Sequence, residues 1–509
     1  MRRLGCLNPV LTMTTFDDHP AGEMRHGVGL SSLLGCQRAA FVARPYPTLA
    51  ERRGVLRRLR AAIREHAGRL AAAAQCDFSE RAHAETMMVD VLPSVLHINH
   101  LLGGLRRWMK SSRRHTEWLF LTNRAAVMYQ PKGVVGIVVP WNFPVYLALG
   151  PLATALAAGN RCMVKTSEFA PHTSHALRAM LAEVFEEDEV AVVEGDAPVA
   201  RAFSALPFDH IVFTGSPEVG RHVMRAAADN LTPVTLELGG KSPAVVSKSA
   251  DLAVAARRIA HGKTVNAGQI CVAPDYALVP EGEEGAFARH VMEAAARMHP
   301  AGSEDYAAVI HERAYERQQA LIDDARAHGA SVFVCPMPSG GRRMPLHVVL
   351  DVTPAMRIAR EEIFGPILPV FTYRTFEAAI AQIQAGTRPL ALYYFGHDKA
   401  ESDALLKRTH AGGMTLNDWG WHVLNHDMPF GGIGGSGMGN YHGEEGFREL
   451  SHAKSVFSEH RWFPIELFHP PYGNFVQRLA LRMFLGAAPA ANETAPAEGG
   501  SRRRSSQPS

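Results

Sequence analysis

The sequence predicts an α/β fold in which helices cover a largely parallel β-sheet. Between residues 133 and 246, short β-branched runs alternate with helical stretches, which is the pattern of strand–helix–strand units. Glycine-containing or polar segments follow several of these runs. The length of 509 residues exceeds what one hydrophobic core usually supports, so two or three domains are expected.

The elements of this region are expected in a regular order. The predicted strands cover residues 134–139, 162–165, 190–194 and 211–214, and the predicted helices cover 146–158, 173–186 and 217–229. Ligands of parallel sheets bind beyond the carboxyl ends of the strands. Three segments fall at such ends and are expected to share one crevice: Pro140-Trp141-Asn142, Lys165-Thr166-Ser167-Glu168 and Thr214-Gly215-Ser216.

The segment from Gly215 to Gly220 is a candidate phosphate site. Gly215 ends a predicted strand and Pro217 suits the first turn of a helix, whose free N–H groups attract anions. The spacing of Gly215 and Gly220 differs from the Gly-x-Gly-x-x-Gly fingerprint of dinucleotide sites. An ordinary strand-to-helix turn is therefore the alternative.

Two segments carry potential catalytic groups. Cys271 ends Asn-Ala-Gly-Gln-Ile-Cys, and Glu237 lies in Leu-Glu-Leu-Gly-Gly-Lys. A thiolate nucleophile and a carboxylate base together predict an enzyme, although a cysteine alone is usually a small buried hydrophobic residue. The other five cysteines show no C-x-x-C spacing and no nearby histidine pairs, so no metal site and no disulfide framework is expected. A reduced, cytoplasmic protein is the corresponding interpretation.

Charge and hydropathy argue against two classes of partner. The formal net charge of +3 gives no general attraction to nucleic acid or to a membrane surface. The basic residues between 52 and 60 and between 106 and 114 alternate with apolar residues at helical spacing, which predicts solvated helix faces. The apolar stretch 475–485 is too short to cross a bilayer, so it is expected to pack or to lie at an interface.

Several segments together resemble a known family. Four of them occur in the order seen in aldehyde dehydrogenases: Pro140-Trp141-Asn142-Phe143-Pro144, Leu236-Glu237-Leu238-Gly239-Gly240-Lys241, Gly268-Gln269-Ile270-Cys271 and Glu362-Ile363-Phe364-Gly365-Pro366. The resemblance covers residues 45 to 475. Later segments, including Asn417-Asp418 and Tyr441-His442-Gly443, are most similar to the coniferyl-aldehyde and fatty-aldehyde branch.

The resemblance implies an aldehyde dehydrogenase fold with a Rossmann-type NAD(P)-binding domain, an α/β catalytic domain and a small β oligomerisation extension. We expect a loose extension over 1–40, the cofactor domain over 41–237 with an oligomerisation strand at 115–130, and the catalytic domain over 238–420. Residues 421–475 return to the cofactor domain and the oligomerisation segment, and 476–509 form a helix and a disordered tail. A homodimer or homotetramer is implied.

The family implies a role for each catalytic residue. The Cys271 thiolate adds to the aldehyde, and the thiohemiacetal formed becomes a thioester that water hydrolyses. The Asn142 amide and the Cys271 backbone N–H stabilise the oxyanion. Glu237 is the general base, for which a raised pKa is useful. A turn residue at Asn142 and a surface ion pair at Glu237 are the alternatives.

The family also implies the cofactor contacts. Lys165 and Glu168 match a Lys-Pro-Ser-Glu segment that contacts the adenosine ribose, although Thr166 replaces the proline. Glu168 favours NAD, with NADP as the second possibility. Glu362 is expected at the nicotinamide ribose and Phe364 against the cofactor, while Lys165 and Glu362 have surface charges as alternatives. The remaining expected cofactor contacts are Trp141, Gly215, Ser216, Gly220, Leu238 and Gly239.

The substrate expected from the resemblance is an aromatic, coniferyl-type aldehyde or a medium- to long-chain aliphatic aldehyde. Trp419, Trp421 and Tyr146 are candidates for an apolar pocket, or for the hydrophobic core. Rival functions on the same fold are a thiol esterase, an acyl-CoA-forming aldehyde dehydrogenase and an inactive structural paralogue. The presence of Glu237 favours hydrolysis of the thioester.

Overall fold

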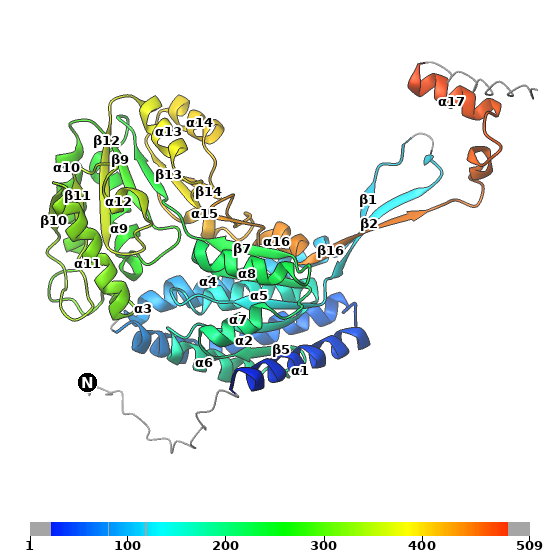
Figure 1. Cartoon of the computed structure of the whole chain (residues 1–509), viewed down its shortest axis with the longest axis horizontal. Coiled ribbons are helices and arrows are strands. Elements are labelled where there is room, and N and C mark those ends of the chain that lie inside the picture. Colours follow the sequence, from blue (N-terminus) through cyan, green and yellow to red (C-terminus); the bar gives the residue numbers. More distant parts are fainter. Residues whose placement is uncertain (1–21, 80, 118–119, 487–509) are drawn as a thin grey trace, which may run out of the picture. The chain divides into compact units, whose positions relative to one another are not determined.

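The computed structural model describes residues 22–79, 81–117 and 120–486 (Figure 1). The chain divides into two compact units. The first consists of Met1–Ser111 and Met128–Lys454, and the second of Ser112–Val127 and Ser455–Ser509. The first unit contains two large β-sheets.

One sheet of the first unit has six strands in the order β15-β7-β6-β3-β4-β5. Their bounds are β3 Val134–Val138, β4 Arg161–Lys165, β5 Val190–Val193, β6 His210–Gly215, β7 Val234–Leu238 and β15 Gly437–Met438. All neighbours are parallel except β15 and β7. The strand order reverses between β3 and β6, which creates the ligand crevice typical of a doubly wound sheet.

Helices cover both faces of this sheet, as the sequence predicts. The helices α2 Leu49–Asp77, α5 Tyr146–Ala158 and α6 Pro171–Ala182 pack together, and α1 Gly22–Ala43, α7 Ala197–Ser204 and α8 Pro217–Ala228 form the other group (Figure 1). The α/β prediction is confirmed. Helix α7 was not predicted, although Asp196 caps its start by accepting a hydrogen bond from the Val199 N–H group.

The expectation of a loose extension over residues 1–40 is wrong for residues 22–40. They belong to α1, whose Leu30 and Leu34 are buried in the core against the six-stranded sheet. Gln37 of the same helix donates a hydrogen bond to the Cys162 carbonyl of β4 at 2.9 Å. An apolar stripe at helical spacing therefore anchors this segment. Residues 1–21 lie outside the described residues.

The basic run at the start of α2 is also only partly solvated. Thr48 and Glu51 form a capping box at the start of this helix. Arg52, one turn later, is buried, and its guanidinium donates hydrogen bonds to the carbonyls of Ala157 and Ala158. These carbonyls end α5, where the helix dipole favours a cation. The prediction of a solvated face is therefore wrong at Arg52.

The second sheet of the first unit has seven strands in the order β10-β11-β12-β9-β8-β13-β14. Their bounds are β8 Pro243–Val246, β9 Tyr276–Pro280, β10 Ser331–Val334, β11 His347–Leu350, β12 Ile367–Tyr373, β13 Ala391–Phe395 and β14 Gly413–Leu416. The longer helices of this part are α9 Leu252–Thr264, α10 Glu284–Met298, α11 Glu312–Ala327, α13 Phe376–Ala385 and α14 Lys399–Arg408. Only β10 runs antiparallel to its neighbour.

The remaining helices of the first unit connect these layers. They are α3 His83–Thr86, the π-helix η1 Met87–Val91, α4 Leu92–Trp108, the 3₁₀-helix η3 Val265–Gly268, α12 Arg357–Arg360, α15 Trp421–Leu424 and α16 Gly443–Glu449. Helix α4 packs against α2 and α5 through buried residues such as Ile98 and Leu101. It thereby extends the helical layer over the six-stranded sheet.

A three-stranded sheet has the order β1-β2-β16, with β1 Ser112–Arg114, β2 Arg124–Pro131 and β16 Ser451–Ser458. In the second unit, Phe120 packs against Phe457 and Phe463. The predicted apolar stretch forms α17 Phe475–Leu485, which follows η4 Ile465–Phe468 and buries no residue. In the described ranges, no helix is long and apolar enough to span a membrane. The disordered tail, predicted from about Ala487, lies outside the described residues.

Candidate active site

The carboxyl ends of three neighbouring strands carry the motifs predicted to meet. The segment with Trp141 and Asn142 follows β3, Gly215 ends β6, and Glu237 lies near the end of β7. The pairing of these strands is parallel, so all three ends lie at one edge of the sheet. The three motifs therefore meet at the edge of the sheet where the strand order reverses.

The Cys271 loop has an unusual backbone. Three consecutive residues before it, Asn266, Ala267 and Gly268, have φ values of +48°, +52° and +71°. A Cβ atom at Gly268 would lie 2.6 Å from the carbonyl oxygen of Gly365, so only glycine fits there. Left-handed conformations of non-glycine residues are strained and gather at functional sites. The loop leaves Cys271 partly exposed.

Asn142 is held beside this loop. Its side-chain nitrogen donates a hydrogen bond to the Gln269 carbonyl at 3.2 Å. In return, the Asn266 side chain donates to the Asn142 carbonyl at 3.0 Å. Asn142 is buried. These contacts bring its amide next to the segment that ends in Cys271. A residue that only formed a turn would not need contacts with this distant segment.

Glu237 is buried at the end of β7. Among the described residues, neither of its carboxylate oxygens has a hydrogen-bond partner. Desolvation raises its pKa well above the ordinary value for glutamate. The alternative of a surface ion pair does not fit this environment.

The Cys271 thiol is affected by the same surroundings. Burial raises its pKa to about 12, and the negative charges of Glu362 and Glu237 act in the same direction. The backbone N–H groups of Cys271 and Val272 act in the opposite direction, because they hydrogen bond to the thiolate. In the protein without bound ligands, the thiol is therefore protonated at neutral pH. We refer to Asn142, Glu237 and Cys271, for which a catalytic role is proposed below, as the catalytic group.

Glu362 lies beside the end of β7. A Cβ atom at Gly239 would overlap its carboxylate, and the Gly240 N–H group hydrogen bonds to it. Burial, with a smaller contribution from Asp275, raises the pKa of Glu362 to about 8. Glycine at position 239 is thus required for the close approach of this carboxylate.

Two further residues predicted to contact the cofactor, Phe364 and Trp141, pack against each other. Their rings form an edge-to-face pair with centroids 5.4 Å apart. Phe364 has a φ of +49°, another left-handed residue at the site. Leu238 packs against α8, because a Cβ atom at Gly220 would lie 2.7 Å from its side chain.

The predicted adenosine end of the site lies at the neighbouring strand ends. Lys165 is buried at the end of β4, where its ammonium donates to the Thr166 carbonyl at 2.6 Å and lies 3.9 Å from the Glu168 carboxylate. It is therefore not a solvated surface charge. Ser216 caps α8 by accepting a hydrogen bond from the Val219 N–H group.

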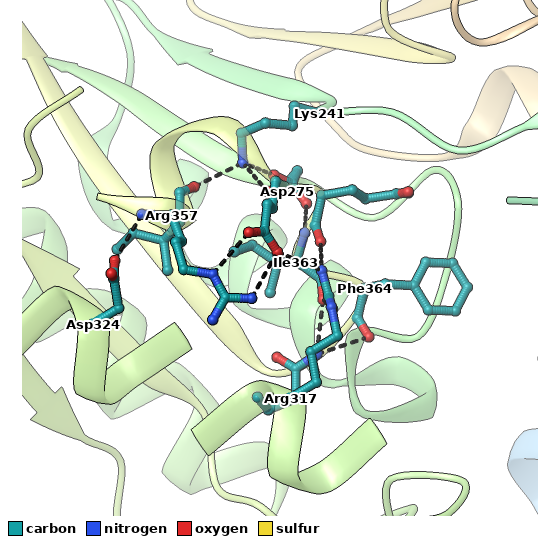
Figure 2. Close-up of polar contacts among 11 residues, drawn as sticks. Lys241, Asp275, Arg317, Asp324, Arg357, Ile363 and Phe364 are labelled. Carbon is teal, nitrogen blue, oxygen red and sulfur yellow. Dashed lines mark hydrogen bonds and ion pairs between the residues drawn. The ribbon is translucent and has the colours of Figure 1, made fainter. Parts of the chain in front are cut away.

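A network of charged residues holds residues 361–366, which we call the cofactor loop (Figure 2). The Lys241 ammonium contacts the Asp275 carboxylate and donates to the carbonyls of Ile358 and Glu361, both at 2.9 Å. Asp275 in turn accepts a hydrogen bond from the Ile363 N–H group at 2.8 Å.

A second group of donors fixes the same loop from α11. Arg317 donates to the carbonyls of Glu362 and Ile363 at 2.5 and 2.9 Å, and Gln318 donates to that of Ile363 at 2.8 Å (Figure 2). Sequence reasoning missed this network. Lys241 carried a signal, because it ends the Leu-Glu-Leu-Gly-Gly-Lys segment, but nothing near Arg317 in the sequence indicates its role.

The three aromatic candidates for a substrate pocket lie in different settings. Tyr146 is buried at the start of α5. The Trp419 indole donates a hydrogen bond to His261, and Trp421 is 59% exposed. Trp421 therefore does not belong to the core.

The strand-end crevice, the cysteine loop and the buried carboxylates define a class of enzyme. A model of the aldehyde dehydrogenase family matches residues 37–456, and the chain belongs to this family. It is an aldehyde dehydrogenase by family, which confirms the resemblance carried by the four sequence segments.

Comparison with individual proteins shows which members of the family this chain is similar to. The chain is 48% identical over 458 residues to a probable coniferyl aldehyde dehydrogenase of Pseudomonas aeruginosa, which covers 90% of this chain and 96% of that protein. Among solved structures, the substrate-bound state of AldH from Staphylococcus aureus has a TM-score of 0.84 at 31% identity, covering 89% and 99% of the two chains. Betaine aldehyde dehydrogenase from Staphylococcus aureus in complex with NAD⁺ has a TM-score of 0.77 at 26% identity, covering 84% and 87%.

Proposed function

We propose that the protein oxidises an aldehyde to its carboxylic acid through a covalent thioester on Cys271. The observation that carries the proposal is the catalytic group: the Asn142 amide is tied to the Cys271 loop, and the Glu237 carboxylate is buried without a partner among the described residues. These are a nucleophile, an oxyanion donor and a base at one strand-end crevice.

In the first step, the Cys271 sulfur forms a bond to the carbonyl carbon, and the carbonyl oxygen becomes an oxyanion. The Asn142 amide, released from the Gln269 carbonyl, donates to this oxygen together with the Cys271 N–H group. Glu237 accepts the thiol proton in our proposal, because a base of raised pKa is required for a thiol of raised pKa.

The oxyanion then re-forms the carbonyl as a hydride leaves the carbon for the acceptor, which gives the thioester. In the second half of the reaction, Glu237, having passed the thiol proton to solvent, activates the water that attacks this thioester. The acid is released and the sulfur leaves as the thiol. A water molecule in this buried region can donate hydrogen bonds to the two Glu237 carboxylate oxygens, which have no other partner among the described residues. This feature supports hydrolysis over the acyl-CoA-forming alternative, because transfer of the acyl group to a CoA thiol requires no base for water at the thioester stage.

NAD⁺ fits the residues at the strand ends. We assign the nicotinamide half to Trp141, Leu238, Gly239, Glu362 and Phe364, and the adenosine half to Lys165, Glu168, Gly215, Ser216 and Gly220. The Glu362 carboxylate, which lies against Gly239, supports this assignment because it can accept hydrogen bonds from ribose hydroxyls. When bound, the cofactor supplies the hydride acceptor. We propose NAD over NADP because a carboxylate at Glu168, expected at the ribose 2′-hydroxyl, disfavours a 2′-phosphate.

For the substrate we propose a coniferyl-type aromatic aldehyde. The name of the relative at 48% identity supports it, as do the segments shared with that branch. A homodimer or homotetramer remains part of the same proposal. So does the domain division given above, except that residues 22–40 belong to α1.

The test is the formation of NADH with coniferyl aldehyde, benzaldehyde and saturated aldehydes of six to twelve carbons. We expect the largest kcat/KM for coniferyl aldehyde with NAD⁺. Equal values across the panel would contradict the aromatic preference, and no NADH or NADPH with any aldehyde would contradict the activity itself.

A further inference from the structure

Three histidines from distant parts of the sequence converge in the interior of the first unit. His97 lies in α4, His426 follows α15, and His442 precedes α16. All three are buried, and one ring nitrogen from each lies within 4.8 Å of the others. Their separation in the chain gives no metal-binding spacing, which explains why the sequence predicts no metal site.

A tyrosine oxygen lies close to two of the three histidines. His97 Nδ1 lies 3.4 Å from His426 Nδ1. The Tyr146 oxygen lies 3.4 Å from His426 Nδ1 and 2.7 Å from His442 Nε2. Ligand atoms of a tetrahedral zinc ion at bond lengths of about 2.0–2.1 Å are separated by about 3.4 Å. Two of the three distances therefore already have the required size.

A hydrogen bond from a neighbouring group sets the orientation and the tautomer of the His97 ring. The Thr154 hydroxyl donates to the Tyr441 carbonyl at 2.8 Å, so it accepts a hydrogen bond from His97 Nε2–H, also at 2.8 Å. This contact fixes the proton on Nε2 and leaves the lone pair of Nδ1 free on the side of His426 Nδ1. Orientation of a ligating histidine by a hydrogen bond from its other nitrogen is typical of metal sites.

All three imidazole rings are buried, and ligation of a metal requires the neutral ring. Nitrogen ligands in a closed, four-coordinate arrangement suit Zn²⁺.

We propose that His97 Nδ1, His426 Nδ1 and His442 Nε2 bind one Zn²⁺ ion, with the Tyr146 oxygen as the fourth ligand. The phenolic proton of Tyr146 is released to solvent on binding, and its anion offsets part of the charge of the buried ion. The ion would connect the segment around 426–442 to α4 and α5. That segment includes Gly437, which pairs with Glu237 across β15 and β7.

The experiment measures metal in the full-length protein after dialysis against Zn²⁺ and then against metal-free buffer. We expect about one zinc per chain in the wild type and in Cys271→Ser, which removes the most plausible competing thiol. His426→Asn should lose the ion, whereas His347→Asn, a buried histidine on β11, should retain it. Thr154→Val should lower the zinc affinity by about 10- to 100-fold, the usual effect of removing an orienting partner.

Cobalt substitution in the wild type tests the ligands without any variant. Co²⁺ should give the intense visible bands of a tetrahedral ion without the near-ultraviolet absorption of a cobalt–thiolate bond. Absence of stoichiometric metal would show that hydrogen bonds alone hold the cluster and would overturn the proposal. Retention of the ion by folded His426→Asn, or thiolate absorption that Cys271→Ser removes, would do the same.

Discussion

The catalytic group and the cofactor loop differ in how their buried polar atoms are satisfied. Among the described residues, the Glu237 oxygens have no hydrogen-bond partner, and Asn142 donates only a 3.2 Å bond to Gln269. In the cofactor loop, the carbonyls of Glu361, Glu362 and Ile363 all accept hydrogen bonds from Lys241, Arg317 or Gln318. The catalytic group thus has buried polar atoms without partners, whereas the carbonyls of the cofactor loop are hydrogen bonded. We call the first region incomplete and the second saturated.

The difference indicates different roles. A buried polar atom without a hydrogen-bond partner lowers the stability of the fold by about 1–3 kcal/mol. We expect such an atom where substrate or water supplies the missing hydrogen bond. The cofactor loop instead holds Phe364 in a left-handed conformation and the Glu362 carboxylate against Gly239. Such a conformation persists when its surroundings determine it through many bonds.

The largest effect is expected from removing the nucleophile. Cys271→Ala should lower kcat by at least about 10⁴-fold, because no covalent intermediate can form. Steady-state NADH production measures the loss. Cys335→Ala, at a buried cysteine on a connecting segment, is the control and should keep the wild-type rate. Full turnover by Cys271→Ala would remove the catalytic group from the mechanism.

Glu237→Gln should lower the steady-state rate by about 10²- to 10⁴-fold, the usual contribution of a general base. If its main role is to activate water, a burst of about one NADH per active site precedes the slow phase, because the thioester accumulates. Stopped-flow absorbance distinguishes the two stages. A slow first turnover would instead place the main role of Glu237 at the thiol proton.

Asn142→Ala should lower kcat by about 10²- to 10³-fold, as expected for the loss of one oxyanion donor. Its effect on KM should be smaller, because the oxyanion exists only after the thiolate has added. Comparison of kcat with KM for one aldehyde measures this division. A change confined to KM would assign Asn142 to substrate binding.

Lys241→Met breaks the saturated region. Removal of one partner from the buried Lys241–Asp275 pair should lower the free energy of unfolding by about 3–5 kcal/mol. In the folded enzyme, displacement of the cofactor loop should lower kcat/KM by about 10- to 100-fold. Urea unfolding and NAD⁺ titration measure the two effects. Lys399→Met, which breaks an exposed pair with Asp403, should leave both nearly unchanged.

The smallest effect concerns pH. Burial raises the pKa of Glu362 to about 8, so its carboxyl group is largely protonated at pH 7 and ionises as the pH rises through 8. The carboxylate is the better acceptor for ribose hydroxyls, so NAD⁺ affinity should increase by up to about tenfold between pH 7 and pH 9. Fluorescence titration measures the affinity. Glu362→Gln should abolish the dependence, and an equal dependence in that variant would assign it to another group.

Local patterns predicted much of the first sheet and its helices. The expected helix 146–158 has the bounds of α5, and the strands that include Val134 and Val190 begin where expected. Buried parallel strands read as continuous β-branched runs, which makes them visible in a sequence. Helix α1 was missed because its apolar residues gain stability only by packing against β4 and its neighbours, which no local pattern reveals.

The sequence by itself determined the family and the chemical types of the predicted site residues, because these depend on short segments such as Gly268-Gln269-Ile270-Cys271. Only the tertiary structure placed Gly239 against Glu362 and brought Arg317 to the cofactor loop. The proximity of His97, His426 and His442 is likewise visible only in the tertiary structure. The physical reason is that hydrogen bonds, desolvation and metal coordination depend on distances in space, which residues far apart in the chain acquire only on folding.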